Sequence, residues 1–218
     1  MKEQIAKYSY YTISIAVYVV LSALFIDKGY FGDNAQQIGA EANWFMNHGI
    51  LSIGDDDYVG TGYHIPAIGY ATAMLWEIFG QHVWVSHIYV GIWAILYLVF
   101  SYEVVSVFSY GWARTKYALC LVLPTTILSQ FATASPDFIM AAAIAILLYG
   151  IVKKKYWGIA IGLLILSIHS MRGVFVGGCL SIGVLWQCHK KELDYKNAII
   201  SFSPTVIILV TYYSYYLT

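Results

Sequence analysis

Six side chains have the types needed for acid–base chemistry and for binding an anion: Asp33, Asn34, His64, Asp137, His169 and Arg172. A carboxylate can act as a general base or bind a cation, and an arginine can stabilise the charge of a phosphate. Histidine can exchange a proton near neutral pH. These groups are scattered along the chain, so they can act together only if the fold gathers them at one place.

Each carboxylate also has a structural interpretation. Asp33 precedes Gln36 by three residues, which is close to a capping box at a helix N-terminus. Asp137 follows Ser135 and Pro136, and this pattern is typical of the first turn of a helix. An acid in that turn interacts favourably with the helix dipole. A capping carboxylate keeps part of its acceptor capacity, so structural and chemical roles stay open together.

The composition predicts the class of protein to which these residues belong. Sixty per cent of the 218 residues are apolar, 11% are charged and the mean hydropathy is +0.66, whereas a globular domain carries roughly 25% charged residues. The net charge of zero offers no basic face to nucleic acid, and the three cysteines lack the spacing of a zinc site.

Eight apolar segments follow one another: residues 8–26, 64–79, 83–108, 117–133, 137–152, 156–170, 173–188 and 197–217. We therefore expect an all-α polytopic membrane protein, with residues 1–218 in a single transmembrane domain.

The distribution of positive charge predicts the topology. If the N-terminus is cytoplasmic and residues 64–79 do not cross, ten of the twelve Lys and Arg are cytoplasmic, and only Lys28 and Arg172 lie outside. If all eight segments cross from the same start, the count becomes three inside against nine outside. An external N-terminus with eight crossings gives nine against three and remains an alternative. Residues 64–79 are the weakest span, because Pro66 lies near their start and Glu77 near their end. We therefore expect about seven spans.

Residues 27–82 then form the first external loop. Within it, Ala35, Ile38, Ala42 and Phe45 recur at helical spacing, which predicts an amphipathic helix on the membrane surface with Glu41 on another face. Residues 64–79 would add a juxtamembrane or re-entrant helix. All six candidate site residues would then gather at the external surface.

Other polar and small residues have structural interpretations. Glu103, near the cytoplasmic end of its span, is expected either to snorkel toward the membrane surface or to pair with Arg114 or Lys116. Two pairs of glycines at four-residue spacing, Gly158 with Gly162 and Gly173 with Gly177, predict close contact between helices.

The order of these motifs resembles that of the GT-C glycosyltransferases, such as the lipid A aminoarabinose transferases and the protein O-mannosyltransferases. The run Gly32-Asp33-Asn34-Ala35 followed by His64-Ile65-Pro66 is similar to their first external loop. Ser135-Pro136-Asp137 looks like their second acidic position, and the element from His169 to Gly173 looks like the point where many members place a lysine. The resemblance covers roughly residues 8–188. It departs from the family pattern at Asn34, Ile65 and Arg172, where Glu, Pro and Lys are common, and it implies the conserved N-terminal core of the fold.

The resemblance implies transfer of a sugar from a polyprenyl-phosphate carrier to an acceptor at the external membrane face. Asp33 would be the catalytic base and Arg172 would stabilise the departing phosphate, helped by the substrate-binding residues His64, His169 and Asn34. Asp137 would orient the acceptor or share a divalent cation with Asp33. The expected partners are the lipid-linked sugar, membrane lipid and a second membrane subunit, and the expected site is a bacterial inner membrane. Two alternatives stay open, namely a non-catalytic GT-C-like partner or lipid-carrier-binding protein, and a small transporter.

Overall fold

A computed structural model describes residues 1–29, 35–49 and 65–216, and these residues contain helices and no strand. The all-α character predicted from the apolar segments is therefore confirmed for this part of the chain. The elements are α1 (Lys2–Phe25), the π-helical turn η1 (Ala35–Ala40), α2 (Glu41–His48), α3 (Ala67–Phe79), α4 (Val83–Val105), α5 (Gly111–Val122), α6 (Thr125–Ala132), α7 (Pro136–Val152), α8 (Tyr156–His169), α9 (Met171–His189) and α10 (Tyr195–Tyr216).

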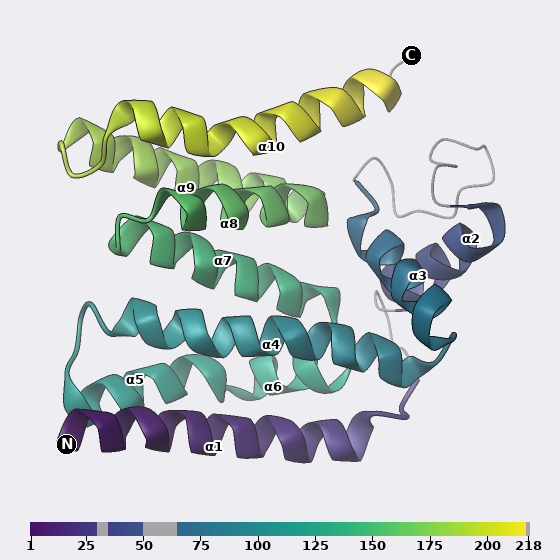
Figure 1. The fold of residues 1–218 in the computed structure, drawn as a ribbon, viewed down its shortest axis with the longest axis horizontal. Helices are drawn as coiled ribbons and strands as arrows, with labels where there is room; N and C mark the ends of the chain where they lie inside the picture. Colours follow the sequence, from purple (N-terminus) through teal and green to yellow (C-terminus); the bar gives the residue numbers. More distant parts are fainter. Residues whose placement is uncertain (30–34, 50–64, 217–218) are drawn as a thin grey trace.

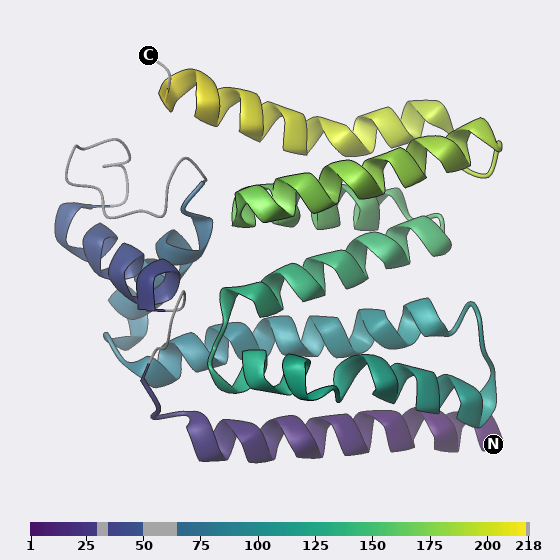
Figure 2. The same ribbon diagram turned by 180° about the vertical axis from the view of Figure 1, so that it is seen from behind.

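The long helices lie side by side, with α1 at one edge of the bundle and α10 at the other (Figure 1). Helix α7 packs between α4 and α8, α10 packs on α8, and α5 packs on α1. Helices α2 and α3 pack on each other at one end of the bundle, where α1 ends and α4, α7 and α9 begin (Figures 1 and 2). We call this end the loop pole. The opposite end holds the N-terminus and the α4–α5, α7–α8 and α9–α10 connections, and we call it the lysine pole.

Hydrogen bonds from α1 and α5 to main-chain carbonyls join the first helices of the bundle. The Tyr10 hydroxyl donates to the carbonyl of Leu98 at 2.8 Å, and the Thr115 hydroxyl donates to the carbonyl of Ala6 at 2.7 Å. Tyr10 is fully buried. Because a buried hydroxyl needs a partner, these bonds fix the positions of α4 and α5 against α1.

Glycines allow α7 and α8 to approach closely. A Cβ added to Gly158 would lie 2.9 Å from the Cα of Gly150, and one added to Gly162 would lie 2.6 Å from the Cβ of Leu147. Both distances are too short for real atoms, so the backbones can meet only because these residues have no side chain. The close contact predicted from the spacing of Gly158 and Gly162 is confirmed. In the second pair, a Cβ added to Gly173 would collide with the carbonyl oxygen of Leu166. A Cβ added to Gly177 would make only ordinary van der Waals contacts.

Four helices of the described residues are long and apolar enough to cross a membrane: Lys2–Phe25, Val83–Val105, Met171–His189 and Tyr195–Ser214. Three shorter helices are also apolar, namely α3, α7 and α8. With 13 residues, α3 is about 20 Å long, against a hydrocarbon core of about 30 Å.

The predicted span of residues 117–133 is wrong in detail. The chain forms two helices there, α5 and α6, with Leu123 and Pro124 between them. Proline lacks the N–H that would continue the helix, and its ring clashes with the preceding turn. Helix α5 also begins at Gly111, so Arg114 and Lys116 lie inside a helix and not in the connection before it.

Positive charge is concentrated at the lysine pole. Ten of the twelve Lys and Arg belong to the N-terminal turns of α1, the start of α5, the connections after α7 and α9 or the first turn of α10, whereas Lys28 and Arg172 lie at the loop pole. Of the two expectations for Glu103, pairing with Arg114 or Lys116 is wrong, because its carboxylate lies 3.6 Å from the Lys153 ammonium. Arg114 instead lies 3.8 Å from Glu3. These acids pair across helices at the same pole, which sequence spacing does not reveal.

Candidate functional site

The first turn of α7 positions Asp137. Ser135 is the N-cap, and its hydroxyl accepts a hydrogen bond from the Asp137 N–H at 3.3 Å, while Pro136 occupies the first helical position. The local interpretation of this motif is therefore confirmed. The capping serine satisfies the main chain, so the Asp137 carboxylate is left for contacts with other helices.

The turn between α8 and α9 positions Arg172. Ser170 caps α9 by accepting a hydrogen bond from the Gly173 N–H at 3.1 Å. Gly173 packs against the carbonyl oxygen of Leu166 in α8, where a Cβ would collide. Arg172 thus sits in the first turn of α9, at the helix end where a cation is least favoured by the helix dipole. A neighbouring anion offsets that cost.

Asp137 supplies this anion. Its Oδ1 atom lies 3.3 Å from Nη2 of Arg172, and the side chains are 31% and 58% exposed. The Oδ1 atom is itself shielded from solvent and accepts no hydrogen bond from the described residues, so the contact with Arg172 is an ion pair. The pair joins the starts of α7 and α9, which both face the loop pole.

His169 ends α8 three residues before Arg172 and is only 3% exposed. The turn thus places a buried imidazole and an accessible guanidinium at the same end of the bundle. Asp33, Asn34 and His64 lie outside the described residues, so the predicted gathering of all six groups can be followed only for Asp137, His169 and Arg172. Within the described ranges, no three His, Cys, Asp or Glu side chains form a set able to hold a metal ion.

A further carboxylate, which the sequence pattern predicts on the polar face of its helix, is buried at the loop pole. Glu41, expected on another face from the apolar residues, is fully buried and packs on Gly69 of α3. Ile38, Ala42 and Phe45 are buried beside it, whereas Ala35, which the sequence pattern predicts on the same apolar face, is exposed. The signal was present in the sequence, because Glu41 follows Ile38 by three residues and therefore lies on the apolar stripe of the helix.

Gly69 makes room for this carboxylate, since a Cβ there would meet the Glu41 side chain. Thr72, one turn further along α3, is also fully buried. An acid buried between α2 and α3 costs solvation energy. Glu41 is therefore a further carboxylate at the loop pole, in addition to Asp137.

Comparisons with protein-family models, with curated proteins and with solved structures find no match to this chain.

Proposed function

We propose that the chain is a multi-pass membrane glycosyltransferase of the GT-C type, which transfers a sugar from a polyprenyl-phosphate carrier to an acceptor at the external face of a bacterial inner membrane. In this proposal α1, α4, α5 with α6, and α7 to α10 make seven crossings, and α2 and α3 lie on the external surface. The N-terminus and the lysine pole are cytoplasmic, as the bias of positive charge favours.

The observation that carries the proposal is the ion pair of Asp137 and Arg172 at the pole with few cations. A guanidinium has five N–H donors in a planar fork, so it can contact a carboxylate and a phosphate at the same time. Asp137 holds the fork in place from α7. The 58% exposure of the Arg172 side chain leaves it within reach of a ligand.

The reaction would proceed by attack of an acceptor hydroxyl on the anomeric carbon of the sugar. The bond between that carbon and the phosphate oxygen breaks, and polyprenyl phosphate leaves with both bonding electrons. Asp33 takes the hydroxyl proton as general base. Arg172 stabilises the negative charge on the leaving phosphate, with His64 and His169 assisting, and Asp137 orients Arg172 or the acceptor.

Binding of undecaprenyl phosphate to the protein in nanodiscs tests the anion-binding role. Arg172→Gln should weaken binding about tenfold or more, because a charge-assisted contact is lost. Arg172→Lys should retain part of the affinity, and Lys190→Gln, which removes a cation at the lysine pole, should change nothing. Equal binding by wild type and Arg172→Gln would contradict the proposal.

A second measurement separates binding from chemistry. With a panel of polyprenyl-phosphate sugars, Asp33→Asn should abolish release of polyprenyl phosphate without loss of carrier binding. Turnover retained by Asp33→Asn would remove the base from the mechanism.

A further inference from the structure

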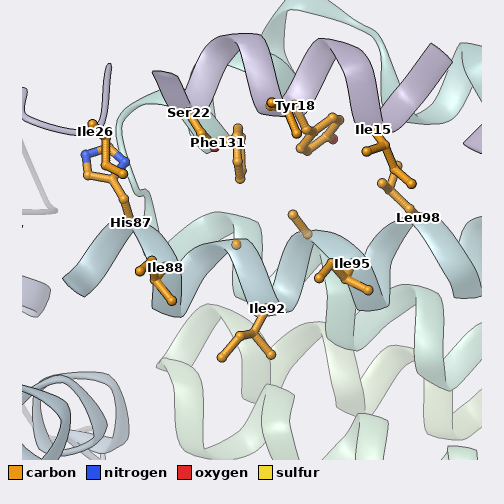
Figure 3. Close-up of a pocket in the computed structure, with 13 residues that line it drawn as sticks. Ile15, Tyr18, Ser22, Ile26, His87, Ile88, Ile92, Ile95, Leu98 and Phe131 are labelled. Carbon is orange, nitrogen blue, oxygen red and sulfur yellow. The ribbon is translucent and has the colours of Figure 1, made fainter. Parts of the chain in front are cut away.

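A groove of about 500 Å³ lies between α1 and α4 (Figure 3). Its inner side is formed by buried residues that include Tyr18, Leu98 and Phe131. Its rims carry isoleucine and valine side chains that are about half exposed, such as Val19 and Ile92. The groove therefore opens outward from the bundle, toward the hydrocarbon that surrounds a membrane protein.

The two ends of the groove differ in polarity. The end at the loop pole holds Ser22 and His87, whereas the other end is lined by Ile15 and Leu98 (Figure 3). The imidazole Nε2 of His87 lies 3.5 Å from the carbonyl oxygen of Lys28. The groove thus runs from a polar mouth near Asp27 and Lys28, which are both exposed, to an apolar end lined by Ile15 and Leu98.

The length of the groove matches one leaflet of a bilayer. From Ile15 to Ile26 the α1 wall covers about 16 Å at 1.5 Å per residue, and half of a hydrocarbon core is about 15 Å. A chain that enters at the mouth would therefore reach the bilayer midplane near Ile15 and Leu98. A molecule anchored by its headgroup in the same leaflet fits this depth.

We propose that this groove is a binding site for one acyl chain of a bilayer phospholipid, whose phosphate lies beside Lys28 and His87 at the loop pole. Lys28 is one of two Lys or Arg residues at this pole, and the other, Arg172, lies in the first turn of α9, away from the residues that line the groove. Lys28 therefore supplies the positive charge for a phosphodiester at the mouth. The inference is independent of the proposed transferase activity, because it concerns a lipid of the surrounding membrane and not the sugar carrier.

Gly91 offers a direct way to close the groove. It lines the groove from α4, and a Cβ added there would meet no heavy atom within 4 Å. A leucine at this position would fill the groove without forcing the helices apart. Gly183 in α9 is the matched control, because its added Cβ also meets nothing within 4 Å and it lies away from the groove.

The experiment uses the full chain in nanodiscs that contain phosphatidylglycerol with a photoreactive diazirine in the acyl chain. We expect crosslinks in wild type to concentrate on residues 15–26 and 88–98. Gly91→Leu should lower the crosslink yield there about tenfold, because a filled pocket cannot hold the chain. Gly183→Leu should leave the yield unchanged, and Lys28→Gln should lower it.

Three outcomes would overturn the proposal. Crosslinks spread evenly over all outward-facing helices would show an ordinary lipid annulus. An unchanged yield in Gly91→Leu would show that the chain lies elsewhere. Displacement of the photoreactive lipid by a small mole fraction of undecaprenyl phosphate would assign the groove to the carrier. The wild-type crosslink map decides the question even if a variant fails to insert, and none of these results depends on sugar transfer.

Discussion

Asp137 and Arg172 lie on different helices, yet their side chains meet at 3.3 Å. They meet because α7 and α8 form an antiparallel pair and α9 then returns in the direction of α7, so both α7 and α9 begin at the loop pole (Figure 1). Close packing at Gly158 and Gly162 sets the spacing of α7 and α8. The ion pair is therefore a product of the hairpin and not of neighbouring positions in the sequence.

The ion pair should contribute little to stability. Both side chains are partly exposed, and pairs of this kind are worth about 0–1 kcal/mol. We expect Asp137→Asn and Arg172→Gln each to lower the free energy of unfolding in detergent by about 1 kcal/mol or less. Near-wild-type stability together with lost carrier binding in Arg172→Gln would mark a functional role. A loss of several kcal/mol in each variant would instead mark the pair as a structural support.

Replacement of Gly162 by alanine should destabilise the bundle strongly. The new Cβ would lie 2.6 Å from that of Leu147, so α7 and α8 must separate, and overpacking of this kind costs about 1–3 kcal/mol. Gly183→Ala is the control, because its Cβ meets nothing within 4 Å. It should stabilise α9 by roughly 0.5–1 kcal/mol, since glycine is a poor helix former. Thermal unfolding in detergent measures both, and equal melting temperatures would contradict the close contact.

Removal of the Tyr10 hydroxyl should loosen α1 from α4. In Tyr10→Phe the buried carbonyl of Leu98 loses its side-chain donor, and we expect a loss of about 0.5–1.5 kcal/mol in the free energy of unfolding. Tyr8→Phe is the matched control, because Tyr8 is 69% exposed. The measurement is unfolding of the two variants side by side. A larger effect at Tyr8 than at Tyr10 would be inconsistent with the buried hydrogen bond.

Glycine at position 154 should stabilise the turn between α7 and α8. Lys154 has a φ of 55°, in the left-handed region where a side chain costs roughly 1–2 kcal/mol and glycine costs little. Lys154→Gly should therefore raise the melting temperature. Lys155→Gly should lower it, because Lys155 has a φ of −103° and glycine there only adds freedom to the unfolded chain. A lower melting temperature for Lys154→Gly would contradict this account of the turn.

Much of the fold could be predicted from the sequence. Composition indicates helices in a membrane, and the Ser135-Pro136-Asp137 motif predicts the start of α7 because capping depends on neighbouring residues alone. The grouping of positive charge follows from the lengths of the helices between the charged turns. For Asp137 and Arg172, the sequence could predict only that they lie at the same pole, and not that they form an ion pair.

Other features depend on more than the apolar pattern of the sequence. Pro124 breaks the helix because proline lacks the N–H that would continue it. The residues on both sides are apolar, so the segment resembles one continuous span. The burial of Glu41 depends on Gly69, which lies in another helix and leaves space for the carboxylate. Partners of Glu103 and Arg114 come from other helices, so they follow only from tertiary packing.

The proposed function requires that the loop pole, with Asp137 and Arg172, faces away from the cytoplasm. In a background with Cys120, Cys179 and Cys188 replaced by serine, single cysteines at Arg172, Lys28, Lys154 and Lys190 can be probed with a membrane-impermeant maleimide. We predict that Arg172→Cys and Lys28→Cys react in intact spheroplasts, and that Lys154→Cys and Lys190→Cys react only after permeabilisation. Reaction of Arg172→Cys only after permeabilisation would contradict the account.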